Sequence, residues 1–142
     1  MHGYDDAGRE VSISDGVTGY QYQYDLANRV TYVDNAGSVG VPQVQLYSFY
    51  DYEGNRTTLL DSLGGAVDAT WQNQRLQSMV LIEEAGKAAQ VDLTYDRVGR
   101  LGSLTRTANW DASTTITTSF TMDLLDRVTS ITHQKVAGEG GC

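Results

Sequence analysis

A short pattern that begins with Tyr-Asp recurs along this chain, and the recurrence constrains the fold more than any other feature. In a full copy two variable residues follow the Tyr-Asp pair, and then come a glycine or asparagine, an arginine and an apolar residue. Six copies, two of them degenerate, start at positions 4, 24, 50, 71, 95 and 122. The starts are 20, 26, 21, 24 and 27 residues apart, which is typical of a repeat architecture and not of a compact single-core domain.

The residues that define the repeat are expected to shape a tight turn. An aspartate side chain accepts hydrogen bonds from backbone N–H groups, and glycine or asparagine tolerates positive φ. The arginine is expected to fold back onto the aspartate, as in Asp25 with Arg29, and to set the geometry of the turn more than to hold the fold together, since exposed ion pairs contribute little. The defining residues are Tyr4, Asp5, Gly8, Arg9, Tyr24, Asp25, Asn28, Arg29, Tyr50, Asp51, Gly54, Arg56, Trp71, Arg75, Tyr95, Asp96, Gly99, Arg100, Met122, Asp123 and Arg127.

Alternating side chains ahead of each Tyr-Asp pair predict β-strands. In the fifth copy Val91, Leu93 and Tyr95 occupy every second position, that is, they have the same parity, and polar residues separate them. A period of two indicates a strand with one buried face and one solvated face, and it places the motif tyrosine on the buried face. Together with the abundance of threonine, glycine, aspartate and asparagine, this pattern predicts an all-β protein.

The apolar residues after each turn have a different spacing. Val30 and Val33 are three positions apart, and so are Leu101 and Leu104. In a regular strand this spacing would put the two side chains on opposite faces, so we expect a β-bulge in the return strand, where one extra residue restores the parity. Isolated helical turns would give the same spacing, but the flanking threonines and the shortness of the segments favour strand.

Turn-forming residues also lie between the copies, and a turn arrives about every 12 residues. The simplest topology is an antiparallel meander of roughly ten to twelve strands, that is, an array of consecutive β-hairpins, and so wide a sheet is expected to coil. We predict a single repeat array over 1–136, as part of a longer array, and a flexible glycine-rich tail over 137–142. Linking turns are predicted at Asp15-Gly16, 34–37, 61–65, 85–87 and 109–112.

Charge and hydropathy argue against several classes of partner. The 142 residues include 18 acidic residues and 10 lysines or arginines, and the net charge of -8 would repel a phosphate backbone, so nucleic acid is not an expected partner. No stretch approaches the roughly 18 apolar residues that span a bilayer, so we expect no membrane insertion. The N-terminus lacks the basic and apolar regions of a signal peptide.

Candidate catalytic and metal-binding residues are few. Adjacent carboxylates such as Asp5-Asp6 and Glu83-Glu84 point to opposite faces of a strand, which is unsuited to an acid and base pair. His2 and His133 lie near opposite ends of the chain, and Ser12 lacks the Gly-x-Ser-x-Gly elbow of a nucleophile. Calcium binding by the Asp-x-x-Gly turns stays an alternative, although the spacing of a calcium loop is missing. We expect no catalytic residue, no metal site and no cofactor.

Three features suggest contacts with other molecules. Tyr47 and Phe49 are on the opposite parity from Tyr50, so they are the better candidates for an exposed contact. The single cysteine, Cys142, is expected to be an exposed thiol, with attachment to another chain as the alternative. The first and last strands of an open sheet carry unpaired backbone groups, which template pairing with a further strand.

The string Tyr-Asp-x-x-Gly-Arg-Leu resembles the YD repeat, also called the RHS repeat, of bacterial Rhs proteins, of the B and C components of insecticidal Tc toxins and of the teneurins. The resemblance covers about Tyr4 to Thr132. It implies hairpins aligned in a long sheet that spirals into a hollow shell, and bacterial shells of this kind enclose a toxic C-terminal polypeptide. The Asp-Pro-x-Gly-Leu segment that ends the family's self-cleaving core region is absent, since the only proline, Pro42, follows Val41. The chain therefore resembles a section of shell wall.

This resemblance implies a non-catalytic structural protein, secreted or at the cell surface as part of a larger bacterial protein. Its partners would be neighbouring YD repeats and the enclosed polypeptide. The alternative is an interaction module that assembles with further copies of itself, or adheres at a cell surface, through its open sheet edges.

Overall fold

The computed structural model describes residues 1–35, 38–83, 85–109 and 114–137, and β-strands make up its regular structure. Strands in the described residues are β1 (His2–Tyr4), β2 (Glu10–Ser14), β3 (Gly19–Tyr24), β4 (Val30–Asp34), β5 (Gln45–Tyr50), β6 (Arg56–Asp61), β7 (Ala66–Gln72), β8 (Arg75–Ile82), β9 (Ala88–Tyr95), β10 (Leu101–Ala108), β11 (Thr114–Met122) and β12 (Val128–Ala137). No helix in these ranges has the length and apolar character to cross a membrane. The prediction of an all-β protein is confirmed.

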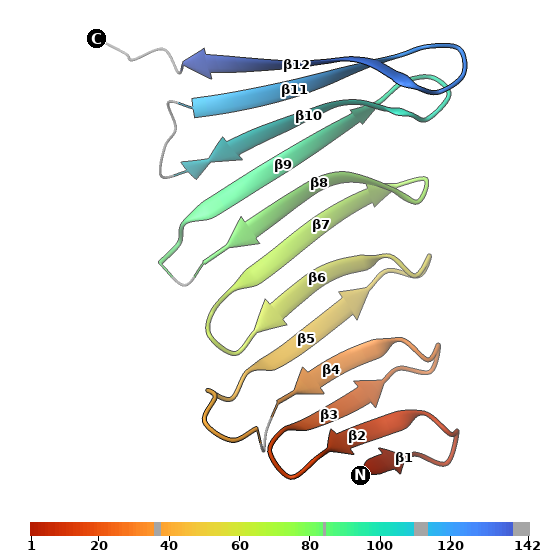
Figure 1. Ribbon diagram of the computed structural model, residues 1–142, viewed down its shortest axis with the longest axis vertical. Helices are drawn as coiled ribbons and strands as arrows, with labels where there is room; N and C mark the ends of the chain where they lie inside the picture. The colour runs from red at the N-terminus through yellow and green to blue at the C-terminus, as the bar shows by residue number, and fades with distance from the viewer. Residues whose placement is uncertain (36–37, 84, 110–113, 138–142) are drawn as a thin grey trace. The chain divides into compact units, whose positions relative to one another are not determined.

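Each strand pairs with the next strand along the chain. The order in the sheet is β1 to β12 without a crossover, and neighbouring strands run antiparallel (Figure 1). The chain is therefore an open array of β-hairpins, as the spacing of the turn residues predicts. Its internal contacts divide it into two compact units, Met1–Ala66 and Val67–Cys142. Each unit contains three copies of the repeat.

In the first unit the two faces of the sheet differ in which aromatic residues they carry. Tyr22 lies opposite Val33, on the same face as the motif tyrosine Tyr24. This face, which carries the motif tyrosines, is called the motif face below, and the other the opposite face. On the opposite face Tyr32 of β4 is paired with Gln23 of β3 on one side and with Tyr47 of β5 on the other.

In the second unit the two faces differ in polarity. Leu93 lies opposite Leu104 on the motif face. On the opposite face Thr105 lies opposite Thr117, and their hydroxyl oxygens are 3.1 Å apart. The motif face thus carries leucines near the motif turns and the polar residues Arg106, Thr118 and His133 farther along the strands, and the opposite face is rich in hydroxyl groups.

A β-bulge follows the motif turn at the start of the return strand. In the second copy Tyr24 lies opposite Val30, and Gln23 lies opposite Tyr32, so Thr31 is an extra residue. The bulge brings the two valines that follow the turn to one face, and this confirms the bulge that their spacing predicts. The equivalent extra residues in other copies are Val11, Thr57, Gly102 and Thr129.

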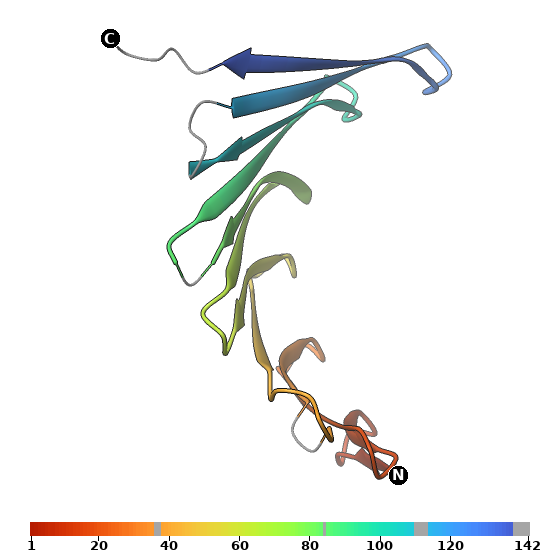
Figure 2. The same cartoon turned by 60° about the vertical axis from the view of Figure 1, so that its left-hand side comes forward.

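No apolar side chain is buried among the described residues, because each unit is a single layer of strands (Figure 2). The motif tyrosines Tyr24 and Tyr95 are half-buried, and Tyr4 is exposed. The expectation of a buried face was therefore wrong: neighbouring side chains cover the motif face in part, and no second layer of described residues packs on it. Within the described ranges the buried polar residues are Asp34, which is 5% exposed, and Thr118.

Candidate functional site at the Tyr-Asp turns

The turn of the second copy shows the geometry that the full-length copies share. The N–H of Asn28 donates to the carbonyl of Asp25 (3.1 Å), and the N–H of Asp25 donates to the carbonyl of Arg29 (3.0 Å). Asn28 has a φ of 62°, in the left-handed region. The residues at the same place in the other copies also have positive φ, namely Gly8, Gly54, Gly99 and Asp126. The prediction of positive φ at the glycine or asparagine is confirmed.

The Asp25 carboxylate organises this turn. Its Oδ1 accepts the N–H groups of Ala27 and Arg29, each at 2.9 Å, and its Oδ2 accepts Nε of Arg29 at 2.7 Å. The N–H of Arg29, the Arg29 guanidinium and the N–H of Ala27 hold the pKa of Asp25 below its ordinary value. The same three contacts form at Asp5, Asp96 and Asp123. The predicted return of the arginine onto the aspartate is confirmed.

The arginine of one hairpin also contacts the following hairpin. In the first unit Nη1 of Arg9 donates to the carbonyl of Asp25 (3.1 Å), and Nη1 of Arg29 donates to the carbonyl of Asp51 (3.0 Å). The guanidinium of Arg29 lies over the ring of Tyr50, 4.6 Å from the centroid. This is a cation–π contact between two hairpins.

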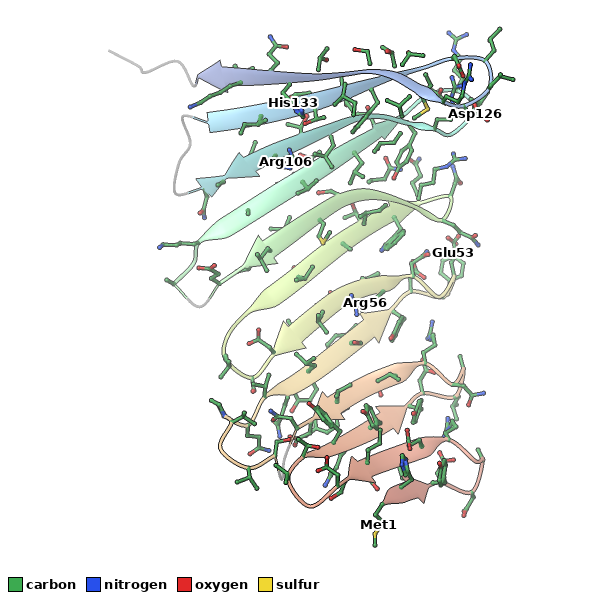
Figure 3. The ribbon with its side chains drawn as sticks, viewed as in Figure 1. Met1, Glu53, Arg56, Arg106, Asp126 and His133 are labelled. Carbon is green, nitrogen blue, oxygen red and sulfur yellow. The ribbon has the colours of Figure 1, made fainter. Side chains whose placement is uncertain are left out.

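The second unit repeats this arrangement. Nη1 of Arg100 donates to the carbonyl of Asp123 (3.1 Å) and to Oδ1 of Asp126 (2.9 Å), which lies in the turn between β11 and β12 (Figure 3). The guanidinium of Arg75 lies 5.8 Å from the centroid of the Tyr95 ring. The arginine thus has two roles, one in its own turn and one toward the next turn.

The motif tyrosine contacts the preceding hairpin in return. The hydroxyls of Tyr24, Tyr50 and Tyr95 donate to the carbonyls of Glu10, Val30 and Leu76, at 2.7, 2.8 and 2.8 Å. Each acceptor directly follows the arginine of the preceding hairpin. We call the contacts of this arginine and this tyrosine between successive hairpins the Arg–Tyr link.

Sequence reasoning missed the Arg–Tyr link, because it assigned the arginine to its own turn and the tyrosine to a buried face. The signal is nevertheless present in the sequence. Tyrosine and arginine recur together in the full copies, whereas the turn itself requires only the aspartate and a residue that tolerates positive φ.

The third copy departs from the predicted assignment. Asn55, and not Arg56, occupies the place of the arginine: its N–H and its Nδ2 donate to the carboxylate of Asp51, both at 2.9 Å. Arg56 is exposed, begins β6 and lies opposite Tyr50 (Figure 3). Since asparagine is shorter than arginine, this copy retains the contacts within the turn without a guanidinium.

The two degenerate copies keep different parts of the motif. After Trp71 the chain turns at Asn73 and Gln74, whose φ values of 52° and 59° suit a two-residue hairpin turn. The copy that starts at Met122 has the complete aspartate turn, but methionine offers no hydroxyl. Its arginine, Arg127, has a side chain that is 72% exposed, compared with 31% for Arg100.

The remaining candidate residues lie apart from the motif turns. Tyr47 and Phe49 are exposed on the opposite face of the first unit, as their parity predicts. His2 contacts Glu10, and Nδ1 of His133 is 3.0 Å from the hydroxyl of Thr118. No group of three or more histidine, cysteine, aspartate or glutamate residues in the described part of the chain is placed to hold a metal ion. Glu84, Cys142 and most of the predicted 137–142 tail lie outside the described residues.

Comparisons with models of protein families and with curated proteins gave no match to this chain. The arrangement itself therefore carries the functional argument. In the copies that start at Tyr4, Tyr24 and Tyr95, the aspartate carboxylate accepts N–H groups of its own turn, and the arginine guanidinium donates to a backbone carbonyl of the following hairpin. The arginine therefore connects successive hairpins.

Proposed function

We propose that this chain is a non-catalytic structural repeat protein that forms a section of a wall and encloses or displays another polypeptide. The resemblance to the YD repeat supports this role and extends the proposal to a secreted or surface location within a larger bacterial protein. The observation that supports this structural role most is the Arg–Tyr link. Residues that recur along the chain and connect successive hairpins are typical of a structural repeat.

The chemistry of the motif residues supports a structural role. A general acid or base must be within hydrogen-bond reach of a substrate. The Asp25 carboxylate instead accepts two N–H groups and Nε within its own turn, and the hydroxyl of Tyr24 donates to the carbonyl of Glu10. Groups held in this way stabilise the array.

The motif face of the second unit suits contact with an extended polypeptide. Leu93 and Leu104 lie opposite each other there, and Leu81 and Ile131 on the same face are exposed. An apolar surface without a second layer gains free energy when another chain covers it. We propose this face as the surface that meets the enclosed polypeptide.

The test uses a chain that cannot fold, reduced and carboxymethylated α-lactalbumin, added to the methyl-labelled protein. Methyl resonances on the motif face, such as those of Leu93, Leu104 and Ile131, are expected to shift, and those of Thr105 and Thr117 on the opposite face are expected to stay. Methyl groups are the readout because they distinguish the two faces of a strand, whereas backbone amides do not. Absence of binding, or equal shifts on both faces, would refute the proposal.

A matched pair of variants controls this test. Ile131 is on the motif face, and Thr132, the next residue, is opposite Ser119 on the other face. Ile131→Gln is expected to weaken binding of the unfolded chain, and Thr132→Gln is expected to leave it unchanged. Equal effects of the two substitutions would show that the face does not matter.

A second function is assembly with further copies through the sheet edges. It is favoured by Tyr4 and Arg127, because neither residue has a partner for an Arg–Tyr link in the described residues. Tyr4 is exposed, and a Cβ added to Gly8 would meet no atom within 4 Å, whereas one added to Gly99 would lie 2.0 Å from Arg75. At the other edge the Arg127 side chain is largely exposed. We propose that Arg127 of one copy contacts the Tyr4 hairpin of another, so that molecules add head to tail.

Sedimentation velocity over a wide range of concentrations tests this second function. The sedimentation coefficient is expected to rise with concentration for the native chain, and to stay that of a monomer for Arg127→Gln and for Tyr4→Ala. Arg97→Gln, which changes an exposed arginine at a variable position of a turn, is the control and is expected to assemble normally. A native chain that stays monomeric throughout would overturn assembly, and the wall proposal would be unaffected.

A further inference from the structure

A cluster of aromatic side chains lies on the opposite face of the first unit, and neither function proposed above uses it. The rings of Tyr32 on β4 and Tyr47 on β5 have centroids 5.2 Å apart and planes inclined by 53°. Phe49, two residues after Tyr47, is 51% exposed. The three rings line an open depression of about 490 Å³, together with Gln23, Thr31 and Ser48.

The arrangement of the rings suits a compact, rounded group. Two parallel stacked rings would offer a ligand a single outer face, whereas the inclined rings of Tyr32 and Tyr47 offer two faces that meet at an angle. Phe49 adds a third aromatic surface to the same depression. A tetrahedral group that lies among these rings can therefore contact more than one of them at once.

The rings of the depression differ from the motif tyrosines in having no cation of their own. The guanidinium of Arg29 lies over the ring of Tyr50, 4.6 Å from the centroid, on the motif face. In the described residues no such contact forms at Tyr32, Tyr47 or Phe49. Their negative faces are thus open to a cation from outside the chain.

The charge of the first unit favours a cation over an anion. Met1–Ala66 contains nine acidic residues, three arginines and no lysine, so the unit as a whole is negative. The residues that line the depression include no lysine or arginine that would compete for the rings. A positively charged ligand is therefore attracted to this unit, and a negatively charged one is repelled.

The buried carboxylate of Asp34 acts on both tyrosines of the depression. The hydroxyl of Tyr32 donates to its Oδ2 (2.7 Å), and this bond raises the pKa of Tyr32 to about 12. A phenol that donates to a carboxylate has a more electron-rich ring, which attracts a cation more strongly. Nε2 of Gln45 donates to the same oxygen (3.1 Å), and Oε1 of Gln45 accepts the hydroxyl of Tyr47 (3.1 Å). Both rings are therefore held in place before a ligand arrives, which lowers the entropic cost of binding.

We propose that this depression binds a trimethylammonium group, as it occurs in choline and on a trimethylated lysine side chain. Aromatic rings around a quaternary ammonium group are a common mode of recognition. The charge of this group is spread over methyl groups that donate no strong hydrogen bond, so it loses little hydration when it contacts the rings. An unmodified lysine ammonium is strongly hydrated, and none of the residues that line the depression offers it a carboxylate.

The test is a titration of the native chain with choline, followed by NMR. Choline is expected to bind with a dissociation constant of roughly 1 mM, as a few cation–π contacts allow, and to shift the ring signals of Tyr32, Tyr47 and Phe49. Neohexyl alcohol, in which a carbon atom replaces the nitrogen of choline, has the same shape without the charge. It is expected to bind about tenfold more weakly, and equal binding of the two compounds would overturn the proposal.

Two further probes distinguish the sources of the group. The acetylated amide of trimethyllysine presents it on a side chain, and the acetylated amide of unmodified lysine is its control. Tighter binding of the trimethyllysine amide than of choline would point to a methylated protein, and the reverse order to a small free cation; either result supports a trimethylammonium site. Equal binding of the methylated and unmodified lysine amides would overturn it.

A matched pair of variants locates the site. Phe49→Ala is expected to weaken choline binding about fivefold, because it removes one aromatic surface. Tyr52→Ala is the control, because Tyr52 is an aromatic residue of the same unit that is 94% exposed outside the depression, and affinity for choline is expected to be unchanged in this variant. Since Phe49 is on the surface, its substitution leaves the fold intact, and the amide spectrum verifies this. Absence of choline binding, or binding that Phe49→Ala does not weaken, would overturn the proposal.

Discussion

The motif turns and the linking turns lie at opposite ends of the strands in each unit (Figure 1). Some linking turns share the backbone conformation and the aspartate contacts of the motif turns, but they lack the contacts of the arginine and the tyrosine. In the linking turn from Asp61 to Gly65, the N–H of Asp61 donates to the carbonyl of Gly65 (2.9 Å), and Gly64 has a φ of 91°. Oδ1 of Asp61 accepts the N–H groups of Leu63 and Gly65. This is the turn of the Tyr-Asp motif without tyrosine or arginine.

The comparison of linking turns with motif turns separates the residues that form a hairpin turn from the residues that connect neighbouring hairpins. A second linking turn, from Glu83 to Lys87, has the same backbone bonds, with Gly86 at positive φ. Backbone geometry of this kind therefore needs an acidic residue and a residue that tolerates positive φ, and it forms at both ends of the strands. The arginine and tyrosine occur at one end, and there they connect each hairpin to its neighbour.

Acid is expected to have the largest effect on the stability of the motif turns, because it acts on the aspartates of several turns at once. Contacts with N–H groups and arginine or asparagine hold the pKa values of Asp5, Asp25, Asp51, Asp96 and Asp123 below the ordinary value. An unfolded aspartate titrates at about 3.9, so the stability that these groups contribute is complete above about pH 4 and is lost as the pH falls through the lower, folded values. Thermal unfolding followed by circular dichroism from pH 6 to pH 2 measures this loss.

One linking turn is expected to lose stability in acid in the same way. The N–H groups of Thr18 and Val17 lower the pKa of Asp15 to about 2. Asp96→Asn is expected to reduce the dependence on pH, whereas Asp92→Asn, in the middle of β9, is expected to retain it. A melting temperature that stays constant from pH 6 to pH 2 would contradict the assigned role of the turn aspartates.

Replacing a motif tyrosine is expected to have the next largest effect. Tyr50→Ala removes the hydroxyl bond to Val30, the cation–π contact with Arg29 and a half-buried ring. A loss of about 2 kcal/mol in the free energy of unfolding is expected, less than for a fully buried ring. Urea denaturation measures it. Tyr52→Ala, in the exposed part of the same turn, is expected to change little, and similar losses for the two variants would argue against the Arg–Tyr link.

The sequence predicts the parts of this structure that depend on neighbours along the chain. The positive φ at Asn28, the return of Arg29 onto Asp25 and the extra residue Thr31 all follow from one hairpin. Contacts between hairpins depend on cross-strand register, which the lengths of the linking segments set. The Arg–Tyr link therefore escaped sequence reasoning, and so did the single layer of strands.

The same distinction applies to the aromatic residues on the opposite face of the first unit. Parity alone predicts that Tyr47 and Phe49 are exposed. Nε2 of Gln45 donates to Oδ2 of Asp34, and Oε1 of Gln45 accepts the hydroxyl of Tyr47. These bonds do not follow from parity, because they require β4 and β5 to align across the linking segment between them. Nor does the pattern show that Asn55 takes the place of an arginine, since Arg56 is its next residue.

Glycine substitutions compare the two kinds of turn directly within the second unit. Gly99 in a motif turn and Gly86 in a linking turn both have positive φ, so alanine is expected to cost about 1 to 2 kcal/mol at either position. A Cβ at Gly99 would lie 2.0 Å from Nη2 of Arg75, and one at Gly86 would meet nothing within 4 Å. Gly99→Ala is therefore expected to cost about 0.5 to 1 kcal/mol more, since Arg75 must leave the Tyr95 ring. Equal costs in urea denaturation would contradict this.

Removing a single hydroxyl is expected to have the smallest effect, and it tests whether arginine and tyrosine act together. Tyr24→Phe deletes the bond to the Glu10 carbonyl and is expected to cost about 1 kcal/mol, whereas Tyr20→Phe, at an exposed ring of the same strand, is expected to cost less. Arg9 lies over the Tyr24 ring at 4.9 Å, so Arg9→Gln and Tyr24→Phe share one set of contacts. Their double-mutant cycle is expected to show a coupling of about 0.5 kcal/mol or more. Additive effects would mean that arginine and tyrosine join the hairpins independently.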